Sequence, residues 1–163
     1  MSDALQVIAA SSLFHGLSME QCQAFVPLAR PHLVAKGEYL FRLGQLAPTL
    51  FIVRSGILEL TMPLSMRGGE QEVAVEEARA GDTVAWSALI DPYRFTMSAR
   101  AGSDVELLGF SPSDLRAALA AQPDIGLRIL TNLAQVIARR LQVTQTMWTR
   151  ELQRAVNVTF GSA

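Results

Sequence analysis

Residues 36–60, KGEYLFRLGQLAPTLFIVRSGILEL, contain the pattern that decides the fold. Short runs rich in aromatic, aliphatic and β-branched residues (YLF, TLFIV and ILEL) are separated by Gly37, Gly44 and Gly56. Glycine reaches positive φ and allows close approach of the backbone, which tight turns between strands require. The stretch therefore predicts short β-strands connected by glycine turns.

The same pattern continues as far as Phe110, through the runs EVAVE, TMSARA and VELLGF. Many short strands at such spacing are typical of a sandwich or a barrel rather than of an open sheet. We therefore place a β-roll at residues 33–110.

Helical signals flank this β-rich part of the chain. Ser18 stands three residues before Gln21 and predicts a capped helix, so that residues 1–31 form N-terminal helices that end at Pro31. After the roll, Ser111, Pro112 and Asp114 predict a second helix start, and residues 112–155 form C-terminal helices.

The last helix is predicted to run from Asp124 to about Ala155, roughly 45 to 50 Å at 1.5 Å per residue. That is longer than a small roll can cover. Its apolar residues recur at three- and four-residue steps, interrupted by Thr144, and predict a homodimer interface of Leu130, Leu133, Ile137, Leu141 and Trp148.

Composition limits the classes of function. The chain has 163 residues and a formal net charge of −1, which predicts one domain without a basic field for nucleic acid. No apolar run approaches the ~20 residues of a membrane span, and no basic segment opens the N-terminus, so we expect a cytoplasmic protein that does not bind membranes. We expect His15 and His32 to lie outside the strands, and the sequence contains no set of metal ligands or catalytic residues. We therefore expect that the protein is not an enzyme.

Three segments resemble the cyclic nucleotide-binding domain family. Residues 36–60 resemble the front half of that domain, and residues 78–115 resemble its phosphate-binding cassette and final strands. Residues 138–144, ARRLQVT, resemble the long helix of the bacterial catabolite-activator branch. The resemblance implies a mainly β fold, a double-stranded β-helix or jelly-roll-like β-roll with N-terminal helices and a long C-terminal dimerisation helix. It also implies a regulatory or sensory function.

The resemblance assigns ligand-binding positions to the cassette and to the long helix. They are Gly81, Val84, Ala85, Trp86, Ser87, Ala88, Arg94, Phe95, Thr96 and Thr144. Two of them depart from the family. Trp86 occupies the position of the family's glutamate, whose carboxylate accepts a hydrogen bond from the ribose hydroxyl. The indole of Trp86 cannot accept a hydrogen bond. The family's phosphate-binding arginine falls on Phe95, with Arg94 one residue earlier on the opposite side of the strand.

These departures predict weak or absent binding of cyclic AMP. Each lost charge-assisted hydrogen bond weakens binding by about 1.5 to 3 kcal/mol. The arginine contact is retained only if a bulge lets Arg94 reach the phosphate. We expect Trp86 to be buried near Thr144, either plugging the pocket or lining one for a flatter, more apolar ligand.

We assign no cofactor. The ligand that the resemblance implies is a cyclic nucleotide, cAMP or cGMP, and another small molecule is the alternative. The alternative is a scaffold domain with a degenerate pocket that binds a protein effector. Only eight residues, VNVTFGSA, follow Ala155, so we expect no helix-turn-helix and no direct DNA binding.

Overall fold

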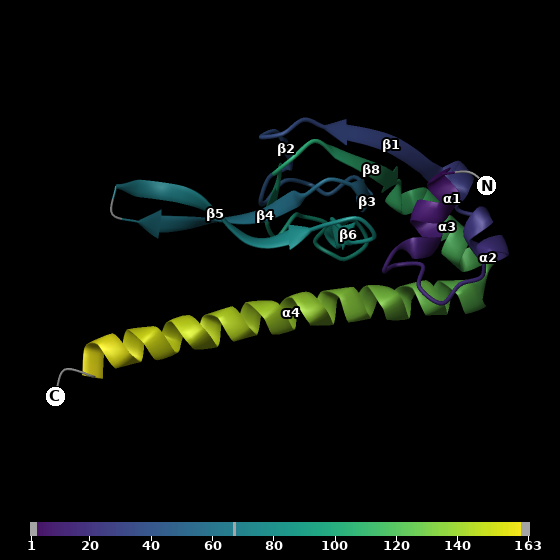
Figure 1. Ribbon diagram of the computed structural model, residues 1–163. Coiled ribbons are helices and arrows are strands. Elements are labelled where there is room, and N and C mark those ends of the chain that lie inside the picture. Colours follow the sequence, from purple (N-terminus) through teal and green to yellow (C-terminus); the bar gives the residue numbers. More distant parts are fainter. Residues whose placement is uncertain (1–2, 67, 161–163) are drawn as a thin grey trace.

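The computed structural model describes residues 3–66 and 68–160, and it contains two antiparallel four-stranded sheets (Figure 1). The first has the order β1-β8-β3-β6, from β1 (Ala29–Val34), β8 (Val105–Phe110), β3 (Leu50–Ser55) and β6 (Thr83–Val84). The second has the order β2-β7-β4-β5, from β2 (Tyr39–Phe41), β7 (Ser98–Ala101), β4 (Leu58–Met66) and β5 (Gly69–Ala78). The mainly β architecture with flanking helices is therefore confirmed.

The three glycines of the opening stretch all have positive φ, as their spacing predicts. Gly37, Gly44 and Gly56 have φ angles of 87°, 81° and 89°. Gly56 is constrained most, because a Cβ there would lie 2.2 Å from the carbonyl oxygen of Asp104. This turn between β3 and β4 is therefore closed to any larger residue.

The N-terminal helices pack against one end of the roll (Figure 1). They are α1 (Asp3–Ala10), α2 (Met19–Gln23) and the 3-10 turn η1 (Val26–Leu28). The predicted capping box at α2 is present, because Ser18 accepts from the Gln21 amide and the Gln21 side chain accepts from the Ser18 amide. β1 begins at Ala29 and therefore includes Pro31. It is an edge strand, and edge strands tolerate proline. His32 consequently lies inside a strand, contrary to our expectation.

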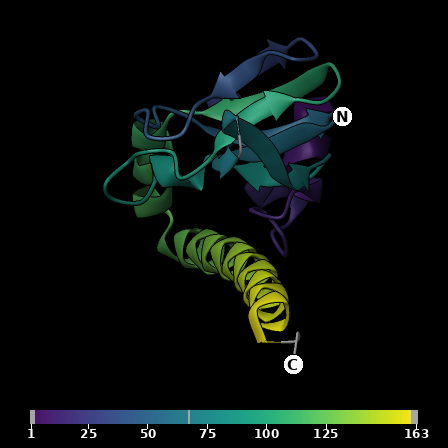
Figure 2. The same ribbon diagram turned by 90° about the vertical axis from the view of Figure 1, so that its left-hand side faces the viewer.

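The C-terminal part consists of α3 (Pro112–Ala121) and the 38-residue α4 (Pro123–Phe160). Ser111 caps α3, accepting from the Asp114 amide. Both views show α4 running past the roll, and in Figure 1 it continues beneath the β4–β5 hairpin (Figures 1 and 2). Asn132, which is buried, donates to the carbonyls of Leu13 and His15, both at 2.9 Å, and fixes the first half of α4.

The predicted interface stripe divides between two environments. Leu133 is only 2% exposed and belongs to the core of the monomer, and Ile137 packs against that core. Leu133 is therefore not available to a partner, because the roll and the N-terminal segment cover this face of α4. Leu130, Leu141 and Trp148 are 50%, 56% and 65% exposed. Within residues 3–66 and 68–160, no helix combines the length and apolarity needed to cross a membrane.

Candidate functional site

A cavity of about 270 Å³ lies between the roll and α4. Strands, the cassette loop and the long helix all contribute to its wall. The lining residues are Phe41, Leu60, Ala85, Trp86, Ser87, Phe95, Thr96, Met97, Ile137, Arg140, Leu141 and Thr144. Most of these side chains are apolar, and three carry hydroxyl groups. Of the described residues that line the cavity, Arg140 is the only charged one.

The cassette turns sharply where β6 ends. Ala85 adopts left-handed backbone angles (φ 61°, ψ 31°) and leads into the 3-10 turn η2 (Trp86–Ala88). Trp86 begins this turn, is partly buried and packs against the core while lining the cavity. The indole therefore forms part of the wall beside a remaining cavity, and it is partly buried where we expected it to be buried.

Phe95 supplies an aromatic wall at the position where the resemblance implies an arginine. It is 5% exposed and stacks on Phe41, with ring centroids 3.8 Å apart and planes inclined by 12°. Backbone hydrogen bonds hold this residue in place, because its amide donates to Gln45 and its carbonyl accepts from Gly44. The cassette thus presents a flat apolar surface to the cavity at this point.

Arg94 lies outside the cavity. Its side chain is exposed, and Nη1 donates to the carbonyl of Gly44 at 2.8 Å. Because Phe95 points inward, the preceding residue faces the other way, and the proposed bulge does not redirect Arg94. The interpretation in which Arg94 reaches a phosphate is therefore wrong for this structure.

The hydroxyl groups occupy different positions in the wall. Ser87 is 5% exposed, whereas Thr96 is exposed. Thr144 donates to the carbonyl of Arg140 at 3.0 Å, within α4. Trp86 and Thr144 line the same cavity, but among the described residues no hydrogen bond joins them. The roles of all three hydroxyls in ligand binding stay predictions.

Besides Arg94, three of the expected site residues do not line the cavity. Gly81 has φ 90° and borders a separate polar crevice near His15 and Asn132. Val84 is buried in β6, paired with Phe51, and Ala88 is buried at the end of η2. These residues belong to the cassette but do not contact the cavity.

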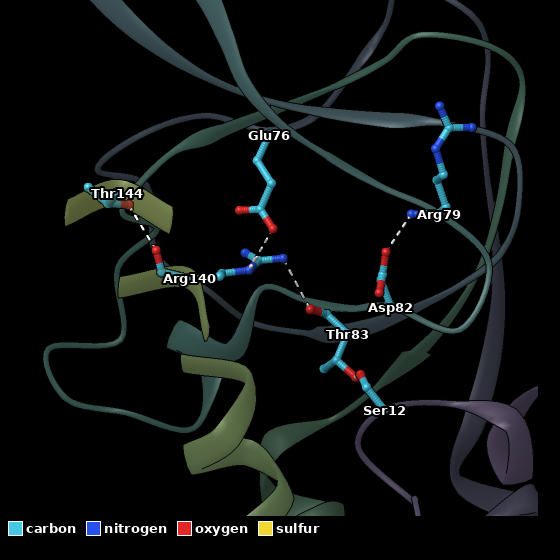
Figure 3. Close-up of polar contacts among 7 residues, drawn as sticks. All are labelled: Ser12, Glu76, Arg79, Asp82, Thr83, Arg140 and Thr144. Atoms are coloured by element: carbon cyan, nitrogen blue, oxygen red, sulfur yellow. Dashed lines mark hydrogen bonds and ion pairs between the residues drawn. The ribbon is translucent and has the colours of Figure 1, made fainter. Parts of the chain in front are cut away.

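Arg140 is the charged cavity residue that our sequence reasoning missed, together with the apolar wall residues Phe41, Leu60 and Met97. It extends from α4 toward the roll, where Nε lies 3.7 Å from Oε1 of Glu76 and Nη2 donates to the Thr83 carbonyl at 3.3 Å (Figure 3). Burial lowers the pKa of the guanidinium, and the carboxylates of Glu76 and Asp82 act in the opposite direction. Arg140 stands four residues before Thr144, so the i, i+4 spacing placed both on one helix face.

The profile of the cyclic nucleotide-binding domain matches residues 31–122, and the chain belongs to this family. The chain is 30% identical over 132 residues to the cyclic AMP receptor protein of Thermus thermophilus, covering 81% of this chain. It is 32% identical over 131 residues to human patatin-like phospholipase domain-containing protein 6, covering 72% of this chain. The chain spans 58% of the bacterial relative and 9% of the human one.

Solved structures show the same fold. The catabolite activator protein of Thermus thermophilus superposes with a TM-score of 0.71 at 29% identity, over 85% of this chain and 62% of that one. A cyclic nucleotide-binding domain from Methylobacillus flagellatus gives a TM-score of 0.75 at 19% identity, over 91% and 82% of the two chains.

Proposed function

We propose that this chain is a regulatory or sensory domain whose cassette has diverged, so that it binds cyclic AMP weakly or not at all. The observation that carries the proposal is the cavity wall itself. Trp86 and Phe95 line it at the positions where the resemblance implies a carboxylate and an arginine. A ribose hydroxyl would meet an indole, and a phosphate would meet the stacked pair of Phe41 and Phe95.

The charge distribution supports the same proposal. A cyclic nucleotide needs an acceptor for the ribose and a cation for the phosphate. No acidic residue is among the described residues that line the cavity, and the cation comes from α4 through Arg140. The family's ligand therefore fits the charged groups of this cavity poorly, whereas an apolar ligand fits its wall.

Titration calorimetry with cyclic AMP and cyclic GMP tests this proposal. We expect dissociation constants above about 100 µM, because two lost charge-assisted contacts weaken binding by roughly 10² to 10⁴. Arg94→Ala should leave any residual affinity unchanged, since Arg94 is bonded to Gly44 outside the cavity. Submicromolar binding of either nucleotide would refute the proposal.

We further propose that the domain is a homodimer through α4. The exposed part of the helix carries Leu130, Leu141, Trp148 and Leu152, each at least 50% exposed. Such an extended apolar stripe suits a second helix. The same stripe also supports the alternative function, in which the domain acts as a scaffold and contacts a protein effector.

A further inference from the structure

A second apolar depression, the hairpin groove, lies between the β4–β5 hairpin and α4, with a volume of about 340 Å³. The hairpin contributes Leu64 and Val75 to its wall, and α4 contributes Val143, Met147 and Trp148. Several of these side chains are substantially exposed, Leu64 and Trp148 by 47% and 65%. The described core of the monomer therefore does not account for this apolar surface.

The groove adjoins the cavity described above. Met97 and Thr144 line both depressions, so the stacked aromatic pair and Trp148 belong to adjoining depressions with a shared wall. Each depression is near the lower limit of ordinary small-molecule sites, which are roughly 300 to 1,000 Å³. Together they suit a ligand that is longer than a nucleotide base and predominantly apolar.

Charge fixes the direction in which such a ligand would lie. The charged residues lining the groove are Glu76 and Glu151, both acidic, whereas Arg140 lines the cavity. An anionic group is repelled from the groove and attracted to the cavity. A ligand with one negative end would therefore place that end at Arg140 and its neutral part along the groove.

The guanidinium of Arg140 can accommodate a further anionic group. The Arg140 side chain is 15% exposed, and its contacts are long: 3.7 Å to Glu76 and 3.3 Å to the Thr83 carbonyl (Figure 3). Among the described residues, these contacts engage Nε and Nη2 but not Nη1. A buried guanidinium is stabilised by a close anion, and its planar fork matches a carboxylate.

We propose that the cavity and the hairpin groove together bind an amphiphilic carboxylate of the fatty-acid class, with its carboxylate at Arg140 and its acyl chain in the groove. This inference rests on the proposed function, because it names the ligand class of the same diverged cavity. An acyl chain makes no demand for hydrogen bonds, which the apolar wall does not supply.

Titration calorimetry with dodecanoate, below its micellar concentration, tests the proposal on the unmodified chain. Arg140→Met should weaken binding at least about tenfold, because it removes a charge-assisted contact. Arg139→Met is the matched control, since Arg139 is exposed and does not line the cavity, and it should leave the affinity unchanged. Glu76→Gln should strengthen binding, because it removes the competing carboxylate at a partly exposed site.

The groove is tested separately with a series from hexanoate to dodecanoate. Affinity should rise with chain length in the unmodified chain, because each buried methylene adds apolar contact. Met147→Asp, at a residue 41% exposed, should flatten that rise while leaving hexanoate binding unchanged. Dodecanol, which has the same chain without the charge, should bind at least about tenfold more weakly than dodecanoate.

Each alternative outcome has a distinct meaning. Equal binding of dodecanoate to the unmodified chain and to Arg140→Met, or equal binding of dodecanol, would overturn the proposal. If neither dodecanoate nor cyclic AMP binds, this inference fails and the proposed divergence stands. If cyclic AMP binds tightly and dodecanoate does not, both fail. Dissociation of a dimer by Met147→Asp, with chain-length dependence retained, would assign the groove to a second copy of the chain.

Discussion

At the scale of single residues, Trp86, Phe95 and Arg140 set the chemistry of the cavity. Trp86 offers an N–H donor and a large ring, and Phe95 offers a ring face stacked on Phe41. Neither side chain carries charge, so the charged group of the cavity is supplied by Arg140 on another element. The cation of the cavity therefore comes from the long helix and not from the cassette.

Trp86→Glu tests the contribution of the indole. The change restores an acceptor, so affinity for cyclic AMP should rise at least about tenfold, and binding of dodecanoate should weaken through repulsion. The free energy of unfolding should fall by about 1 to 2 kcal/mol, less than for a fully buried aromatic, because Trp86 is partly exposed. Calorimetry and urea denaturation measure the two effects.

Trp86→Leu is the matched control for that variant. It removes the ring without supplying an acceptor, so cyclic AMP affinity should stay as weak as in the unmodified chain. An equal gain in both variants would mean that steric relief, and not the missing acceptor, limits nucleotide binding.

At the scale of elements, tight turns hold the strands in register. The β3–β4 turn passes so close to the start of β8 that Gly56 has no room for a side chain, with the Asp104 carbonyl 2.2 Å from an ideal Cβ. The two strands that this turn connects, β3 and β4, belong to different sheets. The turn is therefore one of the points at which the roll closes.

Gly56→Ala should lower the free energy of unfolding by about 3 kcal/mol or more, because it combines a left-handed backbone with a backbone clash. Gly37→Ala is the matched control. Gly37 has nearly the same φ, 87°, but nothing lies within 4 Å of an added Cβ, so its cost should be about 1 to 2 kcal/mol. Equal losses in urea denaturation would contradict the role of the close contact.

At the scale of the whole molecule, α4 serves two surfaces at once. Its first half completes the core through Ile129 and Leu133. The helix then continues beneath the β4–β5 hairpin (Figure 1) and carries the exposed stripe. Arg140 and the stripe lie on the same helix, so the cavity and the proposed assembly along α4 share one element.

Leu130→Glu tests that assembly. The unmodified chain should sediment as a dimer at tens of micromolar, and Leu130→Glu should sediment as a monomer, because a two-fold interface brings two like charges together. Leu33→Glu is the control, since Leu33 is 79% exposed but lies on β1. A monomeric unmodified chain, or an equal effect of both substitutions, would contradict dimerisation through this stripe.

Local chemistry in the sequence was sufficient to predict most strands, the glycine turns and the capped helices, and the resemblance gave the family. These features depend on neighbours within a few residues, such as Gly37 in its turn or Ser18 and Gln21 in their capping box. Local chemistry missed β1 and β6, which pair with strands distant in the chain. Tertiary structure alone decided which face of α4 is covered. It placed Leu133 in the core, turned Arg94 away from the cavity and brought Arg140 beside Glu76. Each of these outcomes depends on elements distant in the chain, and helical periodicity cannot distinguish a face that meets the roll from one that meets a partner.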